Sequence, residues 1–257
     1  MYEPKQIPYL LNSAFQENIQ YREYHFQELN DWCMCIWEMK SKQECKQAIY
    51  NEILPDACID IVIDFQSRTI CFSGFSKETE HFVLSGKVDY LGVRMKPGAL
   101  YALFHVEADQ VMDRMIPFTE IETAVNPELF FQCEEAQRIS VLKNYLSEKC
   151  ATVADHPMIH VADRLYEHPN DQTVSAIAAE FGYHQRQLVR IFKRWYGISP
   201  KVLLNILRLH FSLEMMLTEN KKLSDIAAIC GFYDQSHFIK EIKRYTGISP
   251  LQLWEQS

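Results

Sequence analysis

The stretch that decides the fold occurs twice, as VSAIAAEFGYHQRQLVRIFKRWYGISP at residues 174–200 and as LSDIAAICGFYDQSHFIKEIKRYTGISP at residues 223–250. The two copies share Ile-Ala-Ala, a central glycine, Lys-Arg and the ending Gly-Ile-Ser-Pro. Their offset is 49 residues from Gly182 to Gly231 and 50 residues at the ending. An internal repeat of this density predicts two copies of one supersecondary unit.

Each copy predicts a helix, a tight turn and a second helix. Gly182 and Gly231 follow a short apolar helix, and glycine adopts the left-handed conformation that ends a helix and turns the chain. The second helix has apolar residues on one face and polar or basic residues on the other, which is typical of a helix-turn-helix whose second helix enters the major groove. Glutamine and arginine can read base edges, while lysine and arginine neutralise phosphates. The candidate DNA contacts are Gln185, Arg186, Val189, Arg190, Lys193, Gln235, Ser236, His237, Lys240 and Lys243.

The two units, at about 173–197 and 223–247, are joined by a predicted helix over 200–217. A helix of this length spans ~27 Å at 1.5 Å per residue. With its flanking turns, that length suits two successive major grooves on one side of a duplex. One subunit is therefore expected to bind an asymmetric site on double-stranded DNA.

Charge is distributed unevenly along the chain. The net charge is −8, but residues 1–154 hold 14 Lys and Arg against 23 Asp and Glu, whereas residues 155–257 hold 12 against 11. Residues 181–213 contain no acid and six Lys or Arg. Such asymmetry between halves indicates an anionic partner for the second half.

The first half is predicted to be mostly β. Runs rich in β-branched and aromatic residues occur at 33–40, 58–65, 69–75, 80–86 and 89–96, and the acids of CIDIVIDF (58–65) fall on one face. These strands predict a small barrel or sandwich with flanking helices, one of them following Pro97 and Gly98. The fold class is α+β with two domains: a β-rich domain over 1–152 and an all-α tandem helix-turn-helix domain over 153–257.

A helical period begins at Asn126, a candidate N-cap, and continues through Leu129, Cys133, Ala136, Ile139, Leu142 and Leu146. We expect one helix packed on its own β-rich domain. A dimerisation helix is the alternative, although a coiled-coil seam needs longer and stricter heptads. The stretch ATVADHP (151–157) has no strong period and marks the predicted domain boundary.

The segment AAICGFYDQSHFIKEIKRYTGISP (227–250) resembles the signature of the AraC/XylS family of bacterial transcription regulators, and the first repeat resembles the first helix-turn-helix of that family. The resemblance covers roughly residues 155–255 and implies a DNA-binding regulator with two subdomains joined by a long helix. Three residues depart from the family pattern. His184 stands where a small capping hydroxyl is usual, Lys240 replaces arginine and Ile242 replaces phenylalanine. Lys240 keeps the charge without the bidentate fork, so phosphate contact is its expected role.

The first half also resembles a regulatory domain found with this module, through YREYHF (21–26), the tryptophan of CIWEM (35–39), LPDACIDIVIDF (54–65) and LSGKVDYLGVRMKPGALY (84–101). This resemblance implies sensing or oligomerisation. A small β-domain can hold one small ligand, so we expect a small-molecule effector. The candidate contacts are Trp32, Trp37, Asp56, Asp60, Arg94 and Tyr101. Core packing of the tryptophans and a structural ion pair are the competing interpretations, and a constitutive regulator whose first half only dimerises is the alternative.

Motifs for metal or enzymatic chemistry are missing from the sequence. His25, His81 and His105 are isolated, and neither a Gly-rich phosphate loop nor a nucleophile elbow occurs. We therefore expect no metal, no cofactor and no enzyme. The 8 cysteines, with Cys33 and Cys35 placed on one face of a strand, are expected to be buried free thiols in a reducing cytoplasm. The alternative from another class is a DNA-repair or redox enzyme with a reactive cysteine.

The sequence contains no apolar run of ~18 residues, and MYEPKQIPYL has no apolar core of a secretory signal. We expect a cytoplasmic protein with no membrane partner. The expected partners are double-stranded DNA, a small-molecule effector, RNA polymerase if the protein is an activator, and a second copy in a homodimer.

Overall fold

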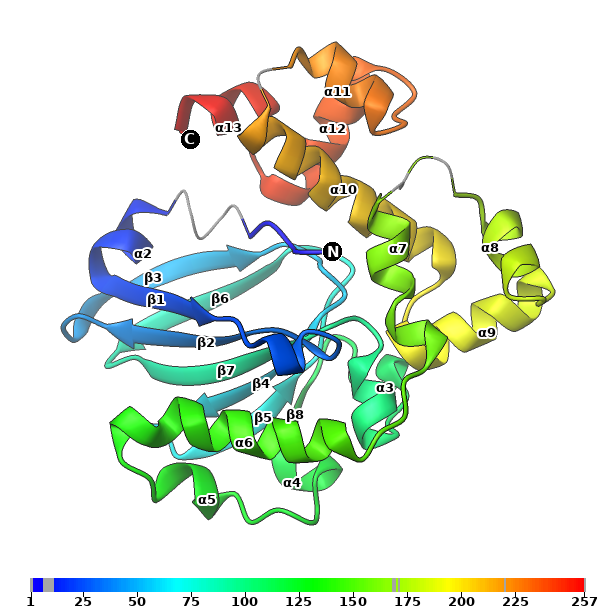
Figure 1. Cartoon of the computed structure of the whole chain (residues 1–257). Coiled ribbons are helices and arrows are strands. Elements are labelled where there is room, and N and C mark those ends of the chain that lie inside the picture. Colours follow the sequence, from blue (N-terminus) through cyan, green and yellow to red (C-terminus); the bar gives the residue numbers. More distant parts are fainter. Residues whose placement is uncertain (1, 7–11, 168–169, 171, 220, 257) are drawn as a thin grey trace.

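The computed structural model describes residues 2–6, 12–167, 170, 172–219 and 221–256. A β-rich part comes first and a helical part follows, with the helices of the second part arranged along one side of the sheets (Figure 1). The predicted α+β class, with a small β-sandwich and an all-helical second half, is confirmed.

The β-rich part consists of two antiparallel sheets. The larger has the strand order β1-β2-β7-β4-β5-β8 and the smaller pairs β3 with β6 in the part of the chain that is described. The strands are β1 (Ile19–Tyr24), β2 (Cys33–Ser41), β3 (Cys45–Ile53), β4 (Ile59–Asp64), β5 (Thr69–Ser73), β6 (Glu80–Gly86), β7 (Asp89–Met95) and β8 (Met115–Pro117). Five of these match predicted strands, whereas β1, β3 and β8 were not predicted.

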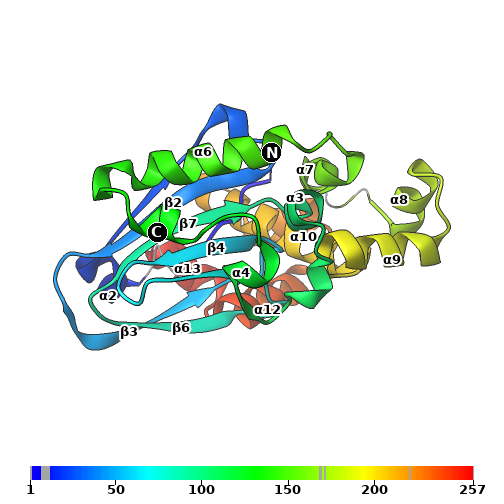
Figure 2. The same cartoon turned by 90° about the horizontal axis from the view of Figure 1, so that it is seen from below.

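The larger sheet has two differently covered faces. In β4, alternate residues Ile59, Ile61 and Ile63 are buried on the face that packs against helices, while Asp60 and Asp64 lie on the other face, as the polarity pattern predicts. The helices α3 (Ala99–Phe104), α4 (Phe118–Ile121), α5 (Glu128–Phe131) and α6 (Arg138–Ala151) belong to the first face. The β3–β6 pair lies across the second face, opposite α6 (Figures 1 and 2).

The single helix predicted from Asn126 is wrong, because the chain forms α5, a 3-10 turn over Glu135–Gln137 and then α6. Phe130 explains the break: its ring packs edge-on against Phe118 and Tyr145, with centroids 5.9 and 5.5 Å apart. This contact holds α5 across the end of the core. The α6 helix buries Leu142 and Leu146 in the same core, so it packs on its own sheet as expected.

Cys33 and Cys35 do not share a face, contrary to the prediction. The register of β2 against β7 shifts between them, which indicates a β-bulge. Cys33 is buried in the core under α6, and Cys35 in the core under the β3–β6 pair.

The second half is helical throughout its described residues. A short helix precedes two helix-turn-helix units, which flank the long α10. The helices are α7 (Val161–Glu167), α8 (Val174–Glu180), α9 (Gln185–Tyr196), α10 (Pro200–Thr218), α11 (Leu223–Ile229), α12 (Gln235–Thr246) and α13 (Pro250–Gln256); α2 (Ser13–Asn18) belongs to the first half. Figure 1 shows α9 and α12 at opposite ends of α10.

The two halves share a hydrophobic core. One continuous cluster of buried residues extends from Ile61 of β4 to Leu207 of α10. Tyr101 of α3 packs on Trp195 of α9 with centroids 4.9 Å apart. Leu54, which follows β3, is buried in the core of the second helix-turn-helix unit. Both units are thus packed against the β-rich part.

Candidate functional site

The second helices of the two units, α9 and α12, begin differently and end alike. Asp234 caps α12 by accepting a hydrogen bond from His237 N at 2.7 Å. His184 provides no such bond in α9, and instead the side chain of Gln187 accepts from His184 N at 2.9 Å. This bond is half of a capping box, so it compensates for the unusual residue at the helix start. Gly197 and Gly247 end the two helices in the left-handed conformation.

The predicted DNA contacts face solvent on both helices. Leu188 and Phe192, with their counterparts Phe238 and Ile242, are fully buried. The opposite faces are exposed, except for Val189 and its counterpart Ile239, which are half-buried. The exposed candidates are Gln185, Arg186, Arg190 and Lys193 on α9, and Gln235, Ser236, His237, Lys240 and Lys243 on α12.

The shared Lys-Arg pair divides between two roles. Lys193 and Lys243 are exposed on the outer faces. Arg194 and Arg244 turn to the β-rich part: Arg194 Nε lies 3.0 Å from Glu107 Oε1, and Arg244 Nη2 lies 3.4 Å from Glu78 Oε1. The equivalent arginines therefore tie both units to the β-rich part, a role that the repeat alone does not reveal.

A cavity of about 600 Å³ lies between the larger sheet and the β3–β6 pair. Four aromatic residues line it: Tyr21, Trp37, Phe82 and Tyr90. Trp37 lies over Gly92, where a Cβ would come within 2.2 Å of the indole ring. The missing side chain at Gly92 thus makes room for the wall of the cavity.

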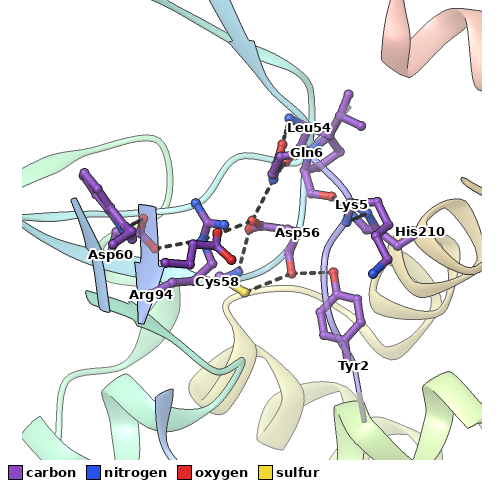
Figure 3. Close-up of polar contacts among 12 residues, drawn as sticks. Tyr2, Lys5, Gln6, Leu54, Asp56, Cys58, Asp60, Arg94 and His210 are labelled. Atoms are coloured by element: carbon purple, nitrogen blue, oxygen red, sulfur yellow. Dashed lines mark hydrogen bonds and ion pairs between the residues drawn. The ribbon is translucent and has the colours of Figure 1, made fainter. Parts of the chain in front are cut away.

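A buried arginine lies at one end of this cavity. Arg94 and Asp60 are directly paired across β7 and β4, and Arg94 Nε lies 3.5 Å from Asp60 Oδ1 and 4.0 Å from Asp56 Oδ2 (Figure 3). Asp60 also accepts a hydrogen bond from Trp37 Nε1 at 2.9 Å. Burial raises the pKa of Asp60 to about 6, although the nearby Arg94 guanidinium lowers it.

The candidate effector contacts separate in the structure. Trp37, Asp60 and Arg94 line the cavity, and Asp56 joins Asp60 and Arg94 around a smaller adjoining one of about 40 Å³. Trp32 instead lies in the core on the helix-covered side of the sheet. Tyr101 packs against Trp195 at the contact between the two halves. Tyr21, on a strand that was not predicted, is a lining residue that the sequence interpretation missed.

The N-terminal segment 2–6 connects Asp56, one of the two aspartates beside Arg94, with α10. Gln6 Nε2 donates to Asp56 Oδ2 at 2.9 Å, and Tyr2 Oη donates to the backbone oxygen of Asp56 at 3.0 Å (Figure 3). His210 of α10 accepts from Lys5 N at 3.0 Å through Nδ1. Residues 2–6 thus contact both Asp56, in the loop between β3 and β4, and the helix that joins the two helix-turn-helix units.

The cysteines form no disulfide within the described residues, and six of the eight are buried. Burial raises the pKa of Cys71 and Cys150 to about 11 and that of Cys230 to about 12. Thiols with raised pKa values are poor nucleophiles near neutral pH. This environment argues against the reactive-cysteine alternative.

Comparisons with known proteins agree with these features. Residues 177–256 match the model of a helix-turn-helix domain, and residues 26–117 match a domain of unknown function, DUF6597. The transcriptional regulator ArgR of Pseudomonas aeruginosa is 31% identical over 137 residues, which cover 51% of this chain and 40% of ArgR. The transcriptional activator RhaS of Escherichia fergusonii is 29% identical over 135 residues, 52% of this chain and 47% of RhaS. Among solved structures, the chain is similar to the C-terminal domain of AraT, a response regulator from Geobacillus stearothermophilus, with 26% sequence identity. The alignment covers 40% of this chain and 87% of that domain, and its TM-score is 0.37.

The fold, with the exposed faces of α9 and α12 at the two ends of α10, defines a protein with a tandem helix-turn-helix domain. By these matches the helical part contains a helix-turn-helix domain similar to those of ArgR and RhaS, and the β-rich part contains a DUF6597 domain. Both of these relatives are transcription regulators. The matched stretches span less than half the length of ArgR and of RhaS. No helix in the described ranges is both long enough and apolar enough to cross a membrane.

Proposed function

We propose that this protein is a sequence-specific regulator of transcription that binds double-stranded DNA through α9 and α12. The observation that carries the proposal is the pair of equivalent, exposed helix faces with basic side chains at the two ends of α10 (Figure 1). The 19 residues of α10 give it a length of ~28 Å. That length, with the flanking turns, matches the distance between successive major grooves on one side of a duplex.

A selection of random duplexes by the full chain tests this proposal. We expect one enriched asymmetric site with two unlike half-sites, because Gln-Arg-x-x-Val-Arg on α9 differs from Gln-Ser-x-x-Ile-Lys on α12. Affinity should fall steeply with salt, since basic side chains displace counterions from the phosphates. Binding that is equally weak for every duplex would contradict the proposal.

We further propose that residues 1–152 form the regulatory part and 153–257 the DNA-binding part, with an effector in the cavity beside Arg94. The cavity lies within the range of ~300–1,000 Å³ that small-molecule sites occupy. The shared core and the segment 2–6 would connect its occupancy to α10. RNA polymerase is the further partner of an activator, and such a role places the protein in the cytoplasm.

A first half that only dimerises is the competing role. Two measurements on the full chain distinguish a regulatory first half from one that only dimerises. One is a metabolite panel screened by thermal shift, and the other is the mass of the protein in solution with and without DNA. A ligand that shifts both the melting temperature and the DNA affinity supports the regulatory role. A dimer that responds to no metabolite supports the alternative.

A further inference from the structure

The guanidinium of Arg94 is buried, and its Nε atom is unpaired. Arg94 is 7% exposed, and its Nε atom has no hydrogen-bond partner within the described part of the chain. Asp60 and Asp56 both approach its Nε atom, at 3.5 and 4.0 Å. At these distances the aspartates balance charge but form no good hydrogen bond. The Nε atom itself is sealed from solvent and unpaired.

The two terminal nitrogens of Arg94, Nη1 and Nη2, form a fork that remains available for hydrogen bonds to a ligand. The two aspartates lie on the Nε side, and Arg94 lines both the large cavity and the smaller one beside it. A buried polar group without a partner is costly, and a guanidinium most favours a planar oxyanion that accepts two parallel N–H bonds. The arrangement therefore favours an acceptor with carboxylate geometry at this end of the cavity.

We propose that the cavity binds a small carboxylic acid with an apolar, preferably flat body, its carboxylate in the fork of Arg94. This inference rests on the proposed regulatory function of the β-rich part and specifies the class of its effector. The body of the ligand would lie along Trp37, Tyr21 and Tyr90. The Tyr21 and Trp37 rings are stacked with centroids 6.4 Å apart, so they form one continuous aromatic wall.

The acids around the cavity define the competing ligand class. Asp64 is committed to a turn, where it accepts bonds from Gln66 N at 2.8 Å and Ser67 Oγ at 2.6 Å. Asp60, Glu80 and the exposed Asp113 also line the cavity. Asp60 already faces Arg94, so a cationic ligand bound there would place its charge beside the Arg94 guanidinium, and one bound at Glu80 or Asp113 would leave the terminal nitrogens of Arg94 without a partner. An anion at Arg94 would accept hydrogen bonds from its guanidinium, which is the only buried guanidinium lining the cavity within the described residues.

Matched ligands test the proposal on the unmodified full chain. Calorimetric titration would compare phenylacetate, indole-3-acetate, benzoate and hexanoate with phenylacetamide, indole-3-acetamide and 2-phenylethylamine. We expect saturable binding of one or more carboxylates, with the corresponding amide weaker by at least about tenfold because it lacks the charge-assisted pair of bonds. Equal binding of acid and amide, tighter binding of the amine, or binding of no carboxylate would overturn the proposal.

A pair of arginine variants locates the carboxylate. Arg94→Lys keeps the charge but loses the fork, so affinity for the best carboxylate should fall by about tenfold or more. Arg114→Lys is the matched control, because Arg114 also borders the cavity but is exposed and donates to Gln110 O at 3.0 Å. Equal effects of the two substitutions would contradict the assignment. Melting curves of both variants show whether Arg94→Lys is folded, and the acid–amide comparison on the unmodified chain decides the matter if it is not.

The same samples separate this inference from the proposed function. Carboxylate binding that leaves DNA affinity unchanged would support the ligand class and contradict effector control. Specific DNA binding with no carboxylate bound would contradict the ligand class and leave the regulator intact.

Discussion

Arg186 and Gln235 lie in the first turns of α9 and α12, where a reading helix meets base edges, and Lys243 lies in the last turn of α12. We predict that Arg186→Ala and Gln235→Ala each relax the base preference at one position, at a cost of ~1–3 kcal/mol for the preferred base. Lys243→Ala should weaken binding to all sequences similarly and lower the salt slope by about one.

Site selection with each variant, repeated at two salt concentrations, measures both effects. The proposed reading role of Arg186 is contradicted if Arg186→Ala selects the same bases as the unmodified chain.

His210 is a buried residue of α10 that ties the two halves together. Its Nδ1 accepts from Lys5 N, so the proton is on Nε2, which donates to Pro55 O at 2.8 Å. Burial lowers the pKa of His210 to about 4, with Arg94 and Lys5 adding to the shift and the Pro55 carbonyl opposing it. In the unfolded chain the pKa is the ordinary 6.5.

The folded state thus keeps His210 neutral at pH values where the unfolded chain protonates it. Its contribution to the free energy of unfolding is complete above pH 6.5 and is lost as the pH falls to 4. Relative to His210→Gln, the unmodified chain should lose about 3 kcal/mol between pH 7 and pH 4. Asp60, with its pKa raised to about 6, acts in the opposite direction, so the difference between the two proteins in urea unfolding is the quantity to measure. Parallel pH curves would refute the role of His210.

At the scale of elements, the two helix-turn-helix units differ in their contact with the sheets. Gly197 ends α9 with φ +69°, and a Cβ there would lie 2.7 Å from Phe75 Cζ and 2.9 Å from Ala108 O. Gly247 ends α12 with φ +74° and has nothing within 4 Å of an added Cβ. The repeat therefore provides a matched pair of glycines with the same backbone and different surroundings.

We predict that both Gly197→Ala and Gly247→Ala lower the free energy of unfolding by about 1 kcal/mol through backbone strain. Gly197→Ala should cost a further ~1–3 kcal/mol, because the methyl group overpacks the contact between the halves. Chemical denaturation measures the difference, and equal losses would show that α9 is not held against the β-rich part.

Adjacent residues near the end of α9 provide another comparison. Lys193 is exposed and free to reach phosphate, whereas Arg194 is bonded to Glu107 and lies over the Tyr101 ring at 5.8 Å. We predict that Lys193→Ala weakens DNA binding and lowers its salt slope, while Arg194→Ala changes DNA affinity by less than about twofold, since its contact lies within the protein. Titrations of one duplex at several salt concentrations test this, and a larger effect at Arg194 would reverse the assignment.

The elements that could be predicted from sequence are those whose pattern is local. The helix-turn-helix pairs follow from the spacing of Gly182 and Gly231 and from the apolar faces of α9 and α12. β3 could not be predicted, because Lys46, Gln47 and Ala48 are exposed and break the alternation of a half-buried strand. Its place depends on pairing with β6, whose partner residues lie 27 to 41 positions further along the chain.

The candidate site was also only partly predictable, because contacts between residues far apart in the sequence leave no local pattern. Asp60 and Arg94 were predicted as polar anchors, and their pairing across β4 and β7 brings them together. The contacts of Tyr2 and Gln6 with Asp56 join residues about 50 positions apart, which no local pattern reveals. Arg244 pairs with Glu78, 166 residues away along the chain, and no local pattern reveals this contact either.

At the scale of the whole molecule, the sheets hold both reading units. Glu107 and Glu78 bind the equivalent arginines of α9 and α12, and the shared core reaches Leu207 in the middle of α10. The reading faces themselves are directed away from these contacts and remain exposed. A single chain therefore presents two different exposed helices, α9 and α12, at a separation set by α10.

We predict that one chain reads two successive major grooves. Insertion of five base pairs between the selected half-sites rotates one groove by about half a helical turn, to the far side of the duplex. The full chain should then lose at least about a hundredfold in affinity, toward its non-specific level. Insertion of five base pairs outside the site should have no effect. Unchanged affinity for the split site, or binding only as two copies on a palindrome, would contradict the account.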